Sequence, residues 1–231
     1  MIFRQLFDHI SSTYTYLIAE RNKGEALIID PVFEHINRYI KLLEELDLKL
    51  VKVIDTHIHA DHISGINELK NKTNCTTIMG DKVKADIVSM KVSDNEIIKV
   101  DNLKIKAMYT PGHTIESFSF LMEDRIFTGD TLLIRGTGRT DFQNGSPSDS
   151  YESIFNNILK LPEETLIYPA HDYKGETVST IKEEKNFNPR LQVKSKQEYI
   201  DIMNNLKLPN PKMMDIAVPI NLGLVKNNLK V

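Results

Sequence analysis

The segment Thr56-His57-Ile58-His59-Ala60-Asp61-His62 decides how this chain is interpreted. Three imidazoles and two carboxylates, counting Asp55, fall within eight residues, directly after the apolar run 50–54. That run is expected to be a buried strand, and in open α/β layers ligands collect beyond the carboxyl ends of strands. Residues two apart in an extended segment point the same way, so His57 and His59 can face one point. Imidazole and carboxylate are the usual ligands of zinc and iron, so the segment predicts a metal site.

Three later segments place similar residues at the ends of predicted strands. They are Thr110-Pro111-Gly112-His113-Thr114, Thr128-Gly129-Asp130 and Pro169-Ala170-His171-Asp172-Tyr173. Five of the seven histidines therefore lie at strand ends, and His9 and His35 are expected to be plain surface residues. Asp61 and His62 follow a bend, where a helix is expected to begin, and should face the same space. The alternative, a histidine-rich surface loop, has no need for this ordered spacing.

Composition excludes several classes of protein. The net charge of −3 provides no basic face, so nucleic acid is not an expected partner. No apolar run is long enough to span a bilayer, and the amino-terminal residues do not resemble a signal peptide. The single cysteine, Cys75, excludes an internal disulfide and a thiolate cluster. A reducing, cytoplasmic compartment is expected.

Apolar periodicity and turn residues predict alternating strands and helices. The expected strands are residues 2–7, 13–19, 26–29, 50–54, 76–79, 96–100, 103–109, 117–122, 125–127 and 165–168. The expected helices are residues 33–47, 62–70, 148–161 and 196–206, with Ser148 and Asp149 capping the third and an extended tail after residue 212. This order splits into two similar halves, which favours one two-sheet α/β domain. The glycine-rich segment 135–145 lacks the Lys-Ser/Thr pair of a P-loop, so a phosphate loop is not expected there.

The four motifs T-H-x-H-x-D-H, G-H-T, T-G-D and P-A-H, in this order, resemble the metallo-β-lactamase superfamily. The resemblance implies an α/β fold, a four-layer αβ/βα sandwich of two mixed sheets flanked by helices. It implies one domain over residues 1–231, with 175–231 as a short C-terminal extension packed on it. Within the superfamily, Gly138-Arg139-Thr140-Asp141-Phe142-Gln143-x-Gly145 and Asn188-Pro189-Arg190 are similar to the persulfide (sulfur) dioxygenases of the glyoxalase II-like branch.

This family resemblance implies a specific chemistry. Such enzymes oxidise a thiol persulfide, usually glutathione persulfide, with dioxygen to sulfite and free thiol, as part of sulfide oxidation. They bind one Fe(II) through positions that match His57, His113 and Asp130, a two-histidine, one-carboxylate set that leaves open metal positions. Zinc cannot change its oxidation state and could not take this role. The remaining site residues would then orient the ligands and bound water: His59, Asp61, His62 and His171.

Two alternatives remain open at this point. In a glyoxalase II-type hydrolase of glutathione thioesters, two zinc ions about 3.5–4 Å apart would hold a bridging water. The first zinc would take His57, His59 and His113, the second would take Asp61, His62 and His171, and Asp130 would lie between them. The other alternative is a metal-binding sensor or scaffold without enzymatic activity.

Substrate contacts are assigned by resemblance to Arg139 and Tyr173. A guanidinium suits the carboxylates of a glutathione-like tail, although an ion pair of Arg139 with Asp141 is an equal alternative. Asp172 either orients its neighbours or caps the turn, and Arg135 is expected to be structural. Expected partners are the persulfide and dioxygen, while a sulfurtransferase that supplies the persulfide and a homodimer are left open.

Overall fold

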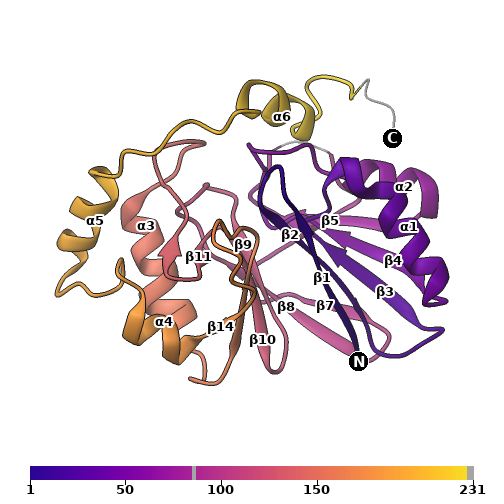
Figure 1. The fold of residues 1–231 in the computed structure, drawn as a ribbon, viewed down its shortest axis with the longest axis horizontal. Helices are drawn as coiled ribbons and strands as arrows, with labels where there is room; N and C mark the ends of the chain where they lie inside the picture. Colours follow the sequence, from indigo (N-terminus) through magenta and orange to yellow (C-terminus); the bar gives the residue numbers. More distant parts are fainter. Residues whose placement is uncertain (85–86, 228–231) are drawn as a thin grey trace.

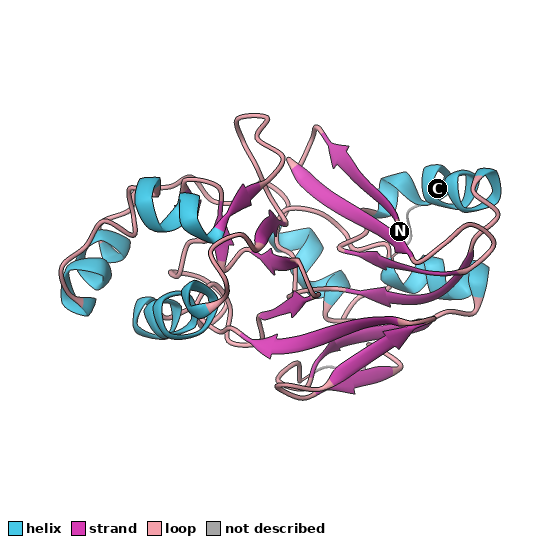
Figure 2. Ribbon diagram, turned by 90° about the horizontal axis from the view of Figure 1, so that it is seen from below, coloured by secondary structure: helices cyan, strands magenta, loops and turns pink. Residues whose placement is uncertain are grey.

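Two six-stranded mixed sheets pack face to face in this computed structural model, which describes residues 1–84 and 87–227 (Figures 1 and 2). The first sheet has the order β1 (Ile2–Asp8), β2 (Thr13–Ala19), β3 (Glu25–Ile29), β4 (Lys49–Ile54), β5 (Thr76–Gly80) and β6 (Met90–Val92). The second has the order β14 (Ser179–Thr180), β13 (Leu166–Pro169), β10 (Arg125–Gly129), β9 (Phe118–Leu121), β8 (Leu103–Tyr109) and β7 (Ile97–Val100). A small ribbon pairs β11 (Leu132–Leu133) with β12 (Gly136–Thr137).

Helices cover the outer face of each sheet, which completes the four predicted layers (Figure 1). On the first sheet lie a 3₁₀ turn (Phe33–His35), α1 (Ile36–Glu45) and α2 (Ile66–Thr73). On the second lie α3 (Pro147–Tyr151), α4 (Ile181–Phe187) and α5 (Lys196–Asn204). The chain continues from α3 through a π-helix (Glu152–Asn157) and a 3₁₀ turn (Ile158–Lys160), and α6 (Met214–Asn221) comes last. None of the helices in the described ranges is long and apolar enough to cross a membrane.

The hydrophobic core has one cluster between the two sheets and one between each sheet and the helices on its outer face. Between them lies an aromatic-rich cluster in which Tyr16 and Ile54 from one sheet meet Phe120 and Phe127 from the other. These four side chains are almost completely buried, as expected for the facing sides of alternating strands. The prediction of a four-layer αβ/βα sandwich of two mixed sheets is confirmed.

Several element predictions were wrong or incomplete. The helix expected at residues 62–70 begins at Ile66, because the preceding backbone bonds elsewhere: Gly65 N–H donates to the Pro31 carbonyl. The helix expected at 148–161 begins at Pro147, with Ser146 as its cap, since Ser146 Oγ accepts from Asp149 N–H. The sequence pattern also failed to indicate the short elements β6, β11, β12, β14 and α4.

The tail expected to be extended after residue 212 instead contains α6. Ala217 of this helix is fully buried in the cluster that includes α1 and α2. Pro219 lies within the helix, where proline is unfavourable, but the packing of one apolar face outweighs that preference.

Candidate metal centre

The ends of β4, β8, β10 and β13 bring seven predicted site residues into two groups. One group is His57, His113 and Asp130, and the other is His59, Asp61, His62 and His171. Within each group, one ligand atom from every residue lies within 4.8 Å of the others. The first group draws His57 from the first sheet and the other two residues from the second sheet, so the centre lies where the two sheets meet.

Hydrogen bonds fix how the two histidines of the first group face the centre. Thr56 Oγ1 donates to Asp30 Oδ2 at 3.0 Å and therefore accepts from His57 Nδ1–H at 2.9 Å. His113 Nδ1–H donates to the Arg139 carbonyl at 2.7 Å. Both rings therefore keep an Nε2 lone pair available, which is the arrangement that metal-binding histidines use. His113 Nε2 lies 3.6 Å from Asp130 Oδ2.

A chain of acids and imidazoles joins the two groups. His171 Nδ1–H donates to Asp130 Oδ1 at 2.6 Å, and its Nε2–H donates to Asp61 Oδ2 at 2.8 Å. His62 Nδ1–H donates to the same Asp61 oxygen at 3.0 Å. Thr13 Oγ1 completes the cluster at 3.0 Å from His171 Nε2. Asp130 Oδ2 thus remains turned toward the first group.

The buried charges shift the pKa values in opposite directions. Burial and the neighbouring histidines hold the pKa of His57 well below its ordinary value, so this ring is neutral. Burial opposes ionisation of Asp130, but His171 and His113 outweigh it and lower the pKa of Asp130. Burial also disfavours a charged His171, yet Asp130 and Asp61 raise its pKa well above the ordinary value. A neutral imidazole beside an ionised carboxylate is the protonation state that binds a cation.

Two buried nitrogen atoms test whether these residues fit a metal. His59 Nδ1 and His62 Nε2 are buried and have no hydrogen-bond partner within the described parts of the chain. Leaving a buried polar atom unpaired costs about 1–3 kcal/mol, and native proteins rarely do so without a reason. Both atoms belong to the second group, and all its donors are nitrogen or oxygen. The residues fit a divalent cation in chemistry and in placement.

A third acidic group lies behind the centre. Asp30, Asp55 and His59 are all buried, and His59 Nε2–H donates to Asp30 Oδ1 at 3.2 Å. Burial would lower the pKa of His59, but the neighbouring Asp30 outweighs it and raises this pKa to about 9. Burial raises the pKa of Asp55 to about 7. The sequence analysis gave Asp30 no role in the site, because nothing near this residue indicates its contact with the histidine loop.

Comparison with known proteins places this site in a family. The sequence model of the metallo-beta-lactamase superfamily matches residues 10–88 and 80–171. Mouse persulfide dioxygenase ETHE1, mitochondrial, is 43% identical over 225 residues, which cover 96% of this chain and 88% of the mouse protein. The crystal structure of ETHE1 from Myxococcus xanthus superposes with a TM-score of 0.94 at 50% identity, covering 97% of this chain and 99% of the other. The chain belongs to the persulfide dioxygenase family. A more distant relative, the hydroxyacylglutathione hydrolase of Dictyostelium discoideum, is 34% identical over 190 residues, 77% of this chain and 69% of the relative.

In this member of the persulfide dioxygenase family, the two predicted substrate residues lie in different settings. The Tyr173 side chain is 70% exposed, and its ring is parallel to that of His171, with an interplanar angle of 5° and centroids 6.2 Å apart. Arg139 donates to both carboxylate oxygens of Asp141, at 2.7 and 2.8 Å, and to the Pro209 carbonyl at 2.7 Å. These hydrogen bonds favour the ion-pair alternative for Arg139.

The remaining polar residues of the predicted set have structural contacts. Asp172 Oδ2 accepts from three backbone N–H groups of residues 174–176, so this carboxylate caps the turn. Arg135 pairs with Glu183 and Glu184, as expected for a structural residue. His35, predicted as a plain surface histidine, instead donates from Nε2–H to the buried Asp8 at 2.9 Å.

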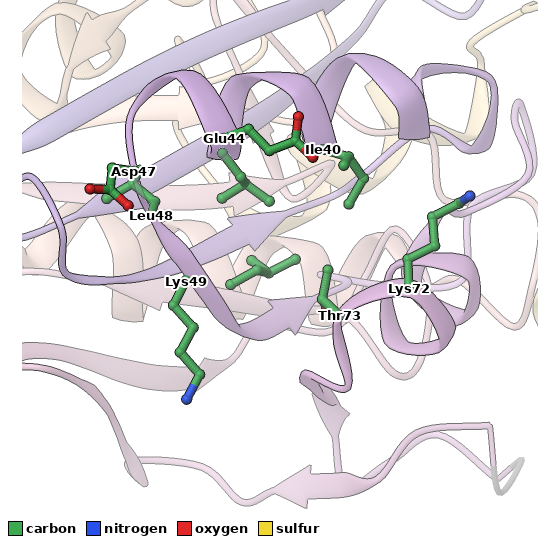
Figure 3. Close-up of a pocket in the computed structure, with 9 residues that line it drawn as sticks. Ile40, Glu44, Asp47, Leu48, Lys49, Lys72 and Thr73 are labelled. Carbon is green, nitrogen blue, oxygen red and sulfur yellow. The ribbon is translucent and has the colours of Figure 1, made fainter.

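A separate pocket of about 530 Å³ lies away from the metal centre (Figure 3). Its lining includes Ile40, Glu44, Lys49 and Thr73, from the end of α1, the start of β4 and the end of α2. The histidine loop follows the opposite end of β4. The predicted site residues therefore take no part in this pocket.

Proposed function

We propose that this chain oxidises the outer sulfur of a low-molecular-weight thiol persulfide, with glutathione as the thiol. Persulfide, dioxygen and water would give thiol, hydrogensulfite and a proton, which balances all atoms and charges. The observation that carries the proposal is the group His57, His113 and Asp130, two imidazoles and one carboxylate with free donor atoms facing one space. Membership of the persulfide dioxygenase family supports the same reaction.

We propose one Fe(II) as the metal of this group. Iron would supply the change of oxidation state that lets triplet dioxygen react with a closed-shell persulfide. The protein fixes the donor atoms beforehand: Thr56 and the Arg139 carbonyl set the tautomers of His57 and His113. Asp130 gives one oxygen to His171, which leaves the other for the metal.

The residues at the edge of the site indicate how the substrate would be bound. We propose that the exposed Tyr173 ring contacts the persulfide or its thiol carrier, since it stacks on His171 beside the centre. Arg139 supports the loop through Asp141 and could reach a carboxylate only by giving up that pair. A sulfurtransferase partner, a homodimer and a cytoplasmic location remain predictions, and the mouse and human relatives are named as mitochondrial.

A two-zinc thioester hydrolase is the second candidate. The unpaired nitrogens His59 Nδ1 and His62 Nε2 favour it, because they could take a second ion. Against it, His171 has both ring nitrogens engaged by Asp130 and Asp61, so it offers no free lone pair in this arrangement. The similarity to a hydroxyacylglutathione hydrolase is also lower than that to the persulfide dioxygenases.

The deciding experiment measures oxygen consumption by iron-loaded protein with glutathione persulfide, together with sulfite. We expect uptake and sulfite in equal amounts, and no uptake by zinc-loaded protein. His113→Ala and Asp130→Ala should abolish iron retention and oxygen uptake, whereas His35→Ala, outside the centre, should retain both. Full turnover without iron would refute the proposal, and hydrolysis of S-lactoylglutathione by a form with two zinc ions would favour the hydrolase.

A further inference from the structure

The loop 55–65 carries four of the seven grouped residues and has no helix or strand of its own. Most of its residues are nevertheless buried, so their backbone N–H and C=O groups need partners from other parts of the chain. Backbone groups of neighbouring segments supply some of these partners. Within the described residues, side chains distant in sequence supply others: Asp30, Glu116, Gln143 and Asn221. Asn221 makes the largest number of these contacts.

Asn221 uses every polar atom of its amide on this loop. Its Oδ1 accepts from Ser64 N–H at 2.9 Å, and its Nδ2 donates to the carbonyls of His59 and His62, both at 2.9 Å. An amide side chain has one acceptor oxygen and two N–H donors, so all are used. Because an N–H can only donate and a carbonyl can only accept, these partners also fix which way the amide faces. Asn221 is buried, with 8% of its surface exposed.

The position of Asn221 depends on α6, the helix that it ends. Ala217 of α6 is fully buried in one cluster with Ile63 of the loop and Ile66, the residue that follows it. Val218 and Leu222 pack against a second cluster that contains Ile58 of the loop itself. Figure 1 shows that the chain after α5 crosses the top of the molecule and leads to α6, which lies near the half that carries α2. α6 therefore packs against apolar residues from two parts of the loop, Ile58 and Ile63.

We propose that Asn221 is a positioning residue that sets the affinity of this site for its metal. The two carbonyls that it holds belong to His59 and His62, whose ring atoms Nδ1 and Nε2 are the buried nitrogens without a partner. Any shift of the loop moves these nitrogens, and it also moves His57, which belongs to the same loop and to the group proposed to hold the metal. The inference rests on the proposal that the centre binds a metal, but not on which reaction the metal serves. Contacts of this outer kind change metal affinity about 10- to 100-fold.

Two substitutions of Asn221 test its hydrogen bonds to the loop, and a third substitution tests the packing of α6. Asn221→Leu keeps the approximate shape but removes every hydrogen bond to the loop. Asn221→Asp keeps an acceptor for Ser64 N–H but turns a carboxylate oxygen toward the two carbonyls. Ile220→Ala is the matched control, because Ile220 packs on the same cluster as Ala217 and has no polar contact with the loop. The measurements are Zn²⁺ affinity by chelator competition, the visible spectrum of Co²⁺-loaded protein, and the melting temperature without metal.

We expect both Asn221 variants to bind Zn²⁺ about 10- to 100-fold more weakly and to give an altered Co²⁺ spectrum. Ile220→Ala should lower the melting temperature while its Zn²⁺ affinity and spectrum stay unchanged. If Asn221→Leu does not fold, Asn221→Gln provides the same comparison with a longer amide. Wild-type affinity and spectrum in the folded variants would overturn the inference and leave the proposed function intact. Failure of the wild-type protein to bind any metal would overturn both.

Discussion

Gly138 offers a direct test of how closely the metal centre is packed. An ideal Cβ at this position would lie 2.0 Å from the Asp130 carbonyl oxygen and 3.0 Å from His113 Cγ. Carbon–oxygen contacts are normally no shorter than about 3.3 Å, so Gly138→Ala requires a displacement of about 1.3 Å. The atoms that must move belong to the backbone of one proposed ligand and the ring of another. A misplacement of about 1 Å costs roughly 100-fold in rate when it affects reacting groups.

The same loop supplies the control. A Cβ on Gly136 would meet nothing closer than 3.9 Å, so Gly136→Ala adds a methyl group without a clash. We expect Gly138→Ala to lower kcat about 100-fold and to weaken metal binding, and Gly136→Ala to leave both unchanged. Overpacking should also lower the free energy of unfolding of Gly138→Ala by about 1–3 kcal/mol, measured by urea denaturation of the metal-free proteins. Equal oxygen consumption and equal metal retention in the two variants would refute this reasoning.

Two further predictions concern buried carboxylates. Asp8→Asn should lower the free energy of unfolding by about 1 kcal/mol at pH 7, because Ser11 loses a charged acceptor. Burial alone would raise the pKa of Asp8, but the hydrogen bonds from Ser11 outweigh it and lower this pKa in the folded protein. The ionised Asp8 therefore stabilises the fold fully at pH values above its ordinary pKa of 3.8. This stabilisation is lost as the pH falls through the folded-state pKa, and urea denaturation at pH 7 and below 3.8 should show a smaller effect at the lower pH. Glu184→Ala should cost about 3–5 kcal/mol by the same method, because Glu184 is fully buried against Arg135. Glu183→Ala removes the more exposed partner of the same guanidinium and should cost less than about 1 kcal/mol; equal losses would contradict this.

The parts of the fold that could be predicted are those encoded locally. The strand before His57 and the strand before His113 are recognisable because their apolar and β-branched residues lie next to each other in sequence. The ordered histidine motif is equally local, and it was enough to predict a metal site after the strand 50–54. The set His57, His113 and Asp130, which the structure groups together, was expected from the family resemblance.

The contacts that could not be predicted join segments far apart in the chain. Nothing in the sequence around Glu116, Gln143 or Asn221 indicates that these side chains bond to the histidine loop. The delayed start of α2 has the same origin, since the preceding residues bond to the Pro31 carbonyl instead of continuing a helix. Tertiary packing also decided α6, in which buried Ala217 outweighs the unfavourable Pro219.

The late position of Asn221 in the chain has a consequence for biosynthesis. Protein chains emerge from the ribosome amino end first, and units fold in that order. The histidine loop is made early, yet its last backbone partner is made near residue 221, after both sheets. During synthesis the loop therefore lacks its three hydrogen bonds to Asn221 until residue 221 has been made. If the centre binds a metal, the arrangement of His59 and His62 beside it is complete only once residue 221 has been made.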